Sequence, residues 1–159
     1  MPFEQKVVVI TGALRGIGAS LVERFRKIGY GVVANSRSID AAGDPAVLVD
    51  GRDTAERVVN IERFGRIDTL INNAGVFIPK QFIDYSETDF VTMIAVNLGG
   101  FFHLSQKAAT WMLRAGSGHI VNVTPPAVVR TPMHSRQMHE FLAGLQPMGR
   151  MDRRYRSVS

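Results

Sequence analysis

The chain has 159 residues, of which 45% are hydrophobic and 21% charged. This length allows one domain and excludes a two-domain enzyme, and the composition excludes a disordered or collagen-like chain. The absence of cysteine excludes a disulfide framework, a thiolate nucleophile and a cysteine zinc site. The first residues do not resemble a signal peptide, and no apolar run is long enough to span a bilayer. We therefore expect a cytoplasmic protein without a membrane partner.

The formal net charge of +5 raises the question of a nucleic-acid partner. Residues 130–159 contain six Arg and two acidic residues, a net charge of +4, so residues 1–129 carry only +1 (5 − 4 = 1). This basic tail lacks interleaved aromatic residues beyond Tyr155. We interpret it as a solvated terminus and expect no nucleic-acid partner.

Short apolar runs alternate with amphipathic stretches, a pattern typical of parallel strands joined by crossover helices. The expected strands are 6–11, 31–35, 46–50, 66–72 and 118–124, and the expected helices are 16–28, 54–64 and 87–114. The last helix contains Asn97 and Gly99-Gly100, poor helix formers that predict a kink. After Pro125-Pro126 the alternation stops. The pattern predicts a doubly wound α/β sheet that ends early.

A glycine-rich turn follows the first expected strand and opens a helix. It reads Thr11-Gly12-Ala13-Leu14-Arg15-Gly16-Ile17-Gly18. Glycines let the backbone approach a pyrophosphate closely, and the N-terminal N–H groups and dipole of a helix attract negative charge. Taken alone, the turn is weak evidence, because glycine-rich turns are common.

Together with Asp50, Asn72-Asn73-Ala74-Gly75 and Asn97, this turn resembles the motifs of the short-chain dehydrogenase/reductase family. The resemblance covers about residues 6–124, with a further patch at 126–133. It implies a Rossmann-like parallel sheet, here truncated to about five strands in the order 3-2-1-4-5. It also implies hydride transfer between a nicotinamide cofactor and a carbonyl or alcohol substrate.

The resemblance also implies the role of each site residue. The phosphate loop would comprise Gly12, Leu14, Arg15, Gly16, Ile17 and Gly18. Asp50 would bind the adenine amino group, unless it is only a turn acid. The adenosine ribose would pack against Asn73, Ala74 and Gly75, and Thr131 would contact the nicotinamide carboxamide. Asn97, the one catalytic residue that remains, would hold a water of the proton relay, unless it only kinks its helix.

Charge favours NADP(H) over NAD(H). The second expected strand ends in Asn35-Ser36-Arg37 and lacks the acid that binds the ribose hydroxyls of NAD(H). Arg15 and Arg37 can together clamp a 2′-phosphate. The alternative is that both are solvated surface charges. No metal site is expected, because His134 and His139 are five residues apart and lack a third ligand.

The family's catalytic segment is missing. Its strand corresponding to 118–124 is followed by a catalytic serine and then by a tyrosine with a lysine four residues on. Here Pro125 follows that strand, and none of Tyr30, Tyr85 and Tyr155 has a lysine four residues on. The direct passage to residues 126–133 predicts the loss of one internal crossover unit, and residues 152–159 no longer resemble the family. We expect an NAD(P)-binding Rossmann domain over 1–124 and, over 125–159, a remnant of the substrate-loop region with an irregular basic tail.

Three functions stay open at this point. The first is an oxidoreductase by descent that binds NADP(H) but is catalytically impaired. The second is a non-catalytic binding or interaction module, and the third is an active reductase with an unorthodox acid such as Tyr155, His134 or water. The loss would place strand 118–124 at the sheet edge and expose side chains of helix 87–114, so either surface is a candidate for self-association. The helix side chains expected to be exposed are Phe101, Leu104, Trp111 and Met112.

Overall fold

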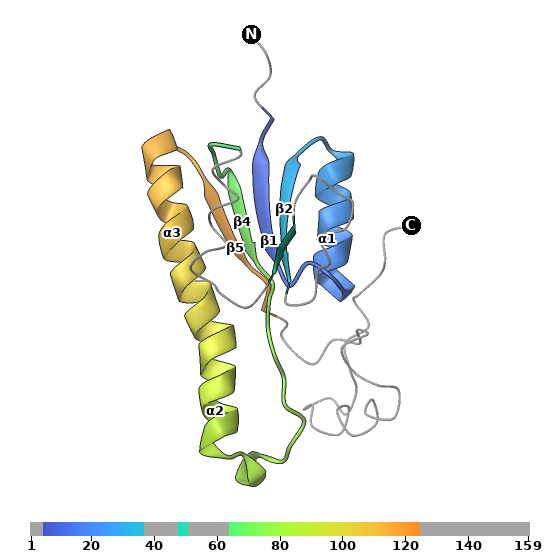
Figure 1. Ribbon diagram of the computed structural model, residues 1–159, viewed down its shortest axis with the longest axis vertical. Helices are drawn as coiled ribbons and strands as arrows, with labels where there is room; N and C mark the ends of the chain where they lie inside the picture. The colour runs from blue at the N-terminus through green and yellow to red at the C-terminus, as the bar shows by residue number, and fades with distance from the viewer. Residues whose placement is uncertain (1–4, 37–47, 51–63, 125–159) are drawn as a thin grey trace.

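The computed structural model describes residues 5–36, 48–50 and 64–124, with the backbone alone for 48–50. These residues form one parallel sheet in the order β3-β2-β1-β4-β5 (Figure 1). The strands are β1 (Val7–Thr11), β2 (Gly31–Ser36), β3 (Leu48–Asp50), β4 (Thr69–Asn72) and β5 (His119–Asn122). The predicted fold class and strand order are therefore confirmed.

Helices cover both faces of the sheet. The helical segments of the described chain are α1 (Gly16–Lys27), the 3₁₀ turn η2 (Phe82–Asp84), α2 (Glu87–Ile94), the π-helical turn η3 (Ala95–Gly99) and α3 (Gly100–Ala115). Of these, α1 and α3 pack on the sheet. In Figure 1, α3 lies beside the sheet, whereas α2 projects beyond the end at which the strands finish. No helix in the described part of the chain is long and apolar enough to cross a membrane.

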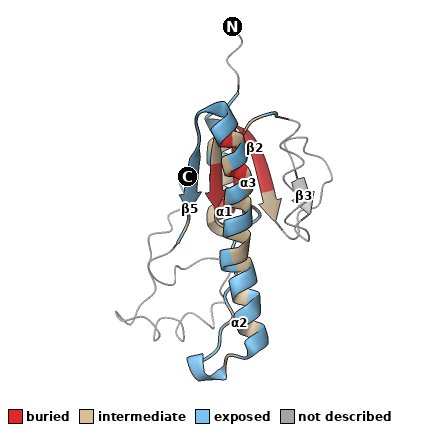
Figure 2. Ribbon diagram, turned by 90° about the vertical axis from the view of Figure 1, so that its left-hand side faces the viewer, coloured by how far each residue is buried: buried red, intermediate tan, exposed pale blue. Residues whose placement is uncertain are grey.

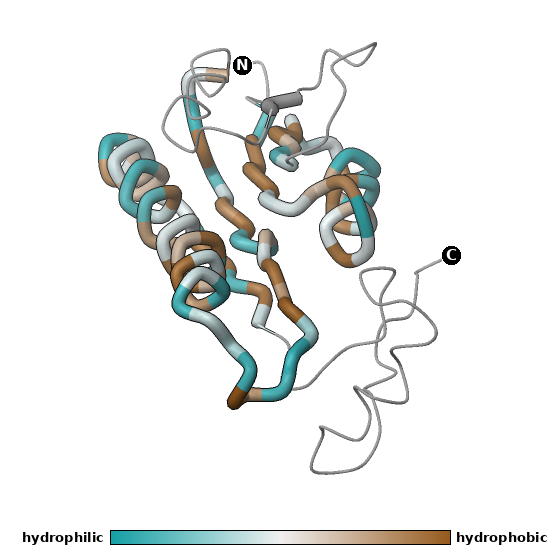
Figure 3. Tube along the Cα trace, turned by 60° about the horizontal axis from the view of Figure 1, so that its bottom comes forward, coloured by the Kyte–Doolittle hydropathy of each residue, from teal (hydrophilic) through white to brown (hydrophobic). Residues whose placement is uncertain are grey.

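The central strand β1 is buried along its whole length, as expected for a parallel strand covered on both faces. Val7 and Val9 belong to a cluster that packs against Leu104 and Trp111 of the α3 side. Val8 and Ile10 belong to a second cluster that packs against α1. Figures 2 and 3 show the buried, hydrophobic residues concentrated in the strands between the helices. The sheet thus lies between two apolar layers, one shared with α1 and one with α3.

The long helix differs from its prediction in two ways. The kink expected at Asn97 is a π-helical turn, so the helix divides into α2 and α3. Of the side chains expected to be exposed, Met112 is buried, and Leu104 and Trp111 pack against the core cluster. That expectation was wrong because these residues lie on the face of α3 that covers β4. The exposed side chains of α2–α3 include Phe90, Ile94, Leu98, Phe102 and Leu113.

The fourth strand begins at Thr69, three residues later than expected from the apolar pattern. Asp68 precedes it and accepts hydrogen bonds from the backbone N of Val7 (2.7 Å) and from Arg66 (2.7 and 2.9 Å). Burial raises the pKa of Asp68, but these hydrogen bonds and the charges of Arg66 and Lys6 outweigh it and hold the pKa below its usual value. The predicted helix 54–64 lies almost entirely outside the described residues.

Candidate functional site

The candidate site lies where β1 and β4 end. These strands pair in parallel, with Ile10 opposite Ile71, so their carboxyl ends are adjacent. From β1 the strand order continues to β2 and β3 on one side and to β4 and β5 on the other. Such a reversal opens a crevice at the carboxyl ends of the strands, where α/β sheets bind their ligands.

Thr11 and Asn73 join the two loops at this point. The hydroxyl of Thr11 accepts hydrogen bonds from the backbone N–H groups of Asn73 and Ala74, both at 2.9 Å. In return, the side-chain amide of Asn73 donates to the carbonyl oxygens of Thr11 (3.0 Å) and Gly12 (3.2 Å). The glycine-rich loop after β1 is therefore fixed to the turn after β4.

Two glycines of the loop have a steric reason to be glycine. Gly12 has a φ of +63°, a conformation that disfavours a side chain. A Cβ on Gly18 would lie 2.1 Å from the carbonyl oxygen of Gly12 and 2.7 Å from the amide nitrogen of Asn73. The first turn of α1 thus packs directly on the loop, and side chains at these positions would displace the backbone.

The N-terminus of α1 faces no acidic neighbour in its own first turn. Arg15 is its N-cap residue, and no side-chain hydrogen bond caps the helix within the described part of the chain. Arg15 and Leu14 are exposed, whereas Gly16 and Ile17 are partly buried as the helix begins. The helix dipole and the guanidinium group give this end of the sheet a positive potential, which suits a phosphate.

Asn97 holds the loop that follows the Asn73-Ala74-Gly75 turn. Its side-chain amide accepts a hydrogen bond from the backbone N of Val76 (2.8 Å) and donates to the carbonyl oxygen of the same residue (3.0 Å). A Cβ on Gly75 would lie 3.4 Å from the Asn97 amide oxygen. Asn97 lies in the π-helical turn, a form that often occurs at functional sites, and its side chain lies against the loop that follows β4.

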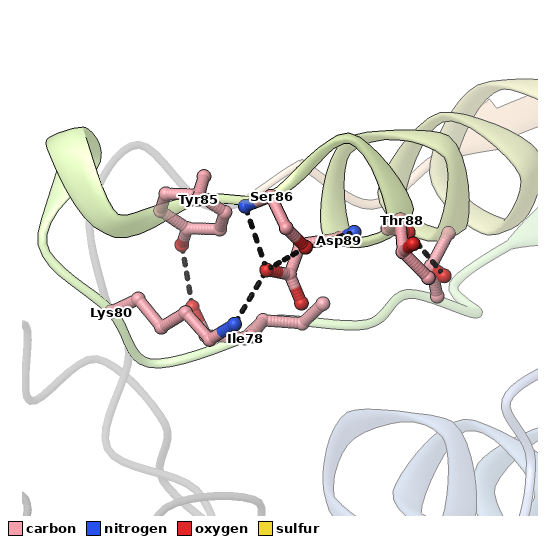
Figure 4. A network of polar contacts seen from close by, with 7 residues as sticks. Ile78, Lys80, Tyr85, Ser86, Thr88 and Asp89 are labelled. Atoms are coloured by element: carbon pink, nitrogen blue, oxygen red, sulfur yellow. Dashed lines mark hydrogen bonds and ion pairs between the residues drawn. The ribbon is translucent and has the colours of Figure 1, made fainter.

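A polar network fixes the entry into α2 (Figure 4). The Asp89 carboxylate accepts hydrogen bonds from Lys80 and from the backbone N and hydroxyl of Ser86, and the hydroxyl of Ser86 caps the helix. Tyr85 donates its hydroxyl hydrogen to the carbonyl oxygen of Ile78. Hydrogen bonds from Lys80 and then Ser86 lower the pKa of Asp89 to about 2. The segment between β4 and α2 is therefore held near its start by Asn97 and at its end by the Asp89 network.

Some predicted site residues do not enter this geometry. Asp50 ends β3 opposite Ser36, but its side chain lies outside the described residues. Arg37 and Thr131 also lie outside them, as does the predicted remnant 125–159. Among the described residues, no cluster of three His, Cys, Asp or Glu side chains is placed to hold a metal ion.

Two residues that the sequence analysis did not assign to the site contribute to it. One is Thr11, described above. The other is Asn72, which is buried and donates hydrogen bonds to Ser105 of α3 and Asn122 of β5, each at 3.0 Å. The amide oxygen of Asn72 is buried without a partner within the described ranges. Thr11 and Asn72 are each a polar residue at the end of a buried strand, and this shared sequence pattern could have indicated their place in the site.

The sequence model of the short chain dehydrogenase family matches residues 6–135. The chain belongs to this family. An oxidoreductase of Thermotoga maritima is 38% identical over 141 residues, which cover 80% of this chain and 56% of the relative. The 3-oxoacyl-acyl-carrier-protein reductase FabG of the same bacterium is 36% identical over 140 residues, which cover 78% and 57%. The chain thus spans about half the length of these relatives.

The fold of this family member also matches solved structures. ElxO, solved with NADP bound, superposes with a TM-score of 0.75 at 20% identity, covering 92% of this chain and 86% of that chain. At this identity the match supports the fold alone. The family membership and the Rossmann-like sheet predicted from the motifs are confirmed.

Proposed function

We propose that this chain binds NADP(H) at the carboxyl ends of β1 and β4 and that, as it stands, it does not reduce carbonyl compounds at appreciable rates. The observation that carries the proposal is the set of hydrogen bonds by which Thr11 and Asn73 fix the glycine-rich loop against the turn after β4. A bound nicotinamide dinucleotide supplies the hydride of a carbonyl reduction. Its pyrophosphate would lie at the glycine-rich loop and the N-terminus of α1, where backbone N–H groups and the helix dipole favour negative charge.

The family membership supports dinucleotide binding, and local charge supports NADP(H) over NAD(H). Arg15 is exposed at the start of α1, and the described end of β2, Asn35-Ser36, has no carboxylate. ElxO, which shares the fold, was solved with NADP and with NADPH bound. Arg15 would bind the 2′-phosphate with Arg37, and Asp50 and Thr131 would bind the adenine and the nicotinamide.

The catalytic impairment rests on the sequence. The chain has no serine directly after the 118–124 strand and no tyrosine with a lysine four residues on. No group in these positions can donate the proton to a carbonyl oxygen or hold the nicotinamide ribose. Asn97 would keep the loop after β4 in place and hold a water. Because the tyrosine that exchanges its proton through this water is missing, the proton relay would stay incomplete.

The test is a fluorescence titration with NADPH and NADH, followed by an assay of NADPH oxidation with aldehydes, ketones and quinones. We expect NADPH binding without turnover. Arg15→Ala should weaken NADPH binding about tenfold, the loss of one charge-assisted contact, and weaken NADH binding much less, because NADH lacks the 2′-phosphate. Arg24→Ala, an exposed arginine in the last turn of α1, is the matched control. Turnover that Tyr155→Phe abolishes would show an unorthodox acid and refute the impairment.

A second proposed function is self-association, which the exposed surfaces favour. All residues of β5 are exposed, and Phe90, Ile94, Leu98 and Phe102 are 44–56% exposed along α2, η3 and α3. Exposed apolar surfaces of this kind are typical of interaction sites. The module would be non-catalytic and would work in the cytoplasm, where a chain without cysteine meets a reducing environment.

A further inference from the structure

The outer edge of β5 is exposed and uncharged. β5 is the last strand of the sheet and pairs with β4 alone among the described residues. Figure 2 shows all of β5 as exposed, and Ile120 and Val121 are 39% and 44% exposed. Protein edges are commonly protected by lysine, proline or a bulge. Residues 117–124 contain no Lys, Arg, Asp, Glu or Pro, so this edge is open to pairing.

The hydrogen bonds to β4 determine which backbone groups face outward. The backbone N of His119 donates to the carbonyl oxygen of Asp68, and the backbone N of Val123 donates to that of Asn72, each at 2.9 Å. The N–H and C=O groups of one strand residue point to the same edge of the strand, and those of the next residue point to the opposite edge. The N–H and C=O groups of Ile120 and Asn122 therefore point to the open edge.

We infer that this edge pairs antiparallel with β5 of a second copy of the chain, with Val121 facing Val121 of that copy. This inference rests on the proposed self-association and names its interface. Most homodimers have two-fold symmetry, and a two-fold axis perpendicular to the sheet makes one residue of the edge strand face its own copy. With Val121 at the centre, Ile120 and Asn122 of opposite copies exchange both of their outward hydrogen bonds. Centring on Ile120 would pair Asn122 with Gly118, which lies outside β5.

The side chains suit this register. Val121 pairs with Ile71 and shares its face of the sheet, where Ile71 belongs to the cluster against α1. The Val121 pair would therefore extend that cluster across the two-fold axis, and apolar cross-strand pairs stabilise sheets. His119 would face Val123, so no charges of like sign meet. In this arrangement the outward hydrogen-bonding groups and the side chains of one β5 match those of another β5. This match favours a second copy of the chain over an unrelated strand.

Cysteine cross-linking tests the register, because the natural chain has no cysteine. Val121 is a non-hydrogen-bonded position, where facing Cα atoms lie about 4.5 Å apart, within the range that a disulfide spans. Under mild oxidation we expect Val121→Cys to form covalent dimers at least about ten times faster than Ile120→Cys, which would face Asn122 and not its own copy. Faster cross-linking of Ile120→Cys would overturn the register.

Sedimentation equilibrium tests the interface without a disulfide. We expect the unmodified chain to be a dimer and Val121→Lys, which would place two lysines face to face, to be a monomer that melts as one folded unit. Leu113→Lys, at an 81% exposed position of α3, is the control and should stay dimeric. A dimer that persists in Val121→Lys but is lost in Phe102→Lys would place the interface on the helices. A monomeric unmodified chain without cross-links would refute self-association itself, and NADPH titration of each variant tests cofactor binding separately.

Discussion

At the scale of single residues, short uncharged side chains shape the site. Thr11 and Asn73 together make four hydrogen bonds between two loops that are about 60 positions apart in the sequence. Because the Thr11 hydroxyl also donates to the carbonyl oxygen of Ile71, its capacity is fully used. The loop geometry that a phosphate would meet is therefore determined before any ligand binds.

Gly18→Ala tests how closely this loop must pack. The added Cβ would lie 2.1 Å from the carbonyl oxygen of Gly12, so the loop must shift. We expect the free energy of unfolding, measured in urea, to fall by about 1–3 kcal/mol, the usual cost of overpacking, and NADPH binding to weaken in the same variant.

Gly100→Ala is the matched control for this substitution. A Cβ at Gly100 meets no atom within 4 Å, and the residue begins α3, where alanine is the better helix former. This variant should be as stable as the unmodified chain or slightly more stable, with unchanged binding. Equal stability and binding in Gly18→Ala would contradict the close packing of α1 on the loop.

The local motifs predicted the glycines and Asn73 as site residues but gave no role to Thr11 and Asn72, whose contacts are with residues distant in the sequence. The spacing of Gly12, Gly16 and Gly18 is visible within eight residues. The hydrogen bonds of Asn72 to α3 and β5 join positions 33 and 50 residues away, which no local pattern encodes. For Asn97 the sequence left two roles open, a water of the proton relay or a kink in its helix, and the structure adds a contact to the Val76 backbone.

At the scale of elements, the sequence predicted where the long helix is interrupted but not in what form. Asn97 and Gly99-Gly100 are poor helix formers, and the interruption indeed lies at 95–99. The form of the interruption, a π-helical turn that contains Asn97 with its contacts to Val76, is not encoded in these propensities. The exposed face of α3 was predicted wrongly, because apolar residues occur on two faces and only the position of β4 decides which face is buried.

The hydrogen bonds at the start of α2 predict that Asp89 titrates at an unusually low pH. Its pKa is lowered to about 2 by hydrogen bonds from Lys80 and Ser86. In the unfolded chain an aspartate titrates near 3.9. The lowered pKa therefore stabilises the fold above about pH 4, and this contribution is lost as the pH falls towards 2.

Carboxyl NMR shifts followed as a function of pH measure this titration. The midpoint for Asp89 is expected near 2 and should rise most in Lys80→Met, which removes the largest cause, and less in Ser86→Ala. Lys27→Met, at the end of α1, should leave it unchanged. An Asp89 midpoint near 4 in the unmodified chain would show that the network of Figure 4 does not form in solution.

At the scale of the molecule, the strand order could be predicted because the local sequence patterns agree with the arrangement of the whole sheet. β1 is apolar from Val7 to Ile10 and becomes the central strand, and the glycine-rich turn lies beside the point where the strand order reverses. Of the surfaces left open by this topology, the sequence predicted the edge at β5 but not the exposed face of α2–α3, since the exposure of a helix face depends on which elements cover it. The edge of β5 and the exposed side chains of α2–α3 follow from the arrangement of the whole sheet.

Ligand linkage gives a test of the whole molecule. A ligand that binds only the folded chain, at 100 times its Kd, raises the free energy of unfolding by about 2.7 kcal/mol, which shifts the melting midpoint of a chain of this size by roughly 5–11 °C. We expect this shift with NADPH and a smaller one with NADH at the same concentration. Adenosine 2′-phosphate 5′-diphosphoribose, which lacks the nicotinamide, should stabilise nearly as well as NADPH, because the glycine-rich loop that Thr11 and Asn73 fix is the part of the site that would bind the pyrophosphate. Stabilisation by NADPH but not by this fragment would mean that the nicotinamide side carries the binding energy, and it would refute a site built mainly on β1, β4 and their loops.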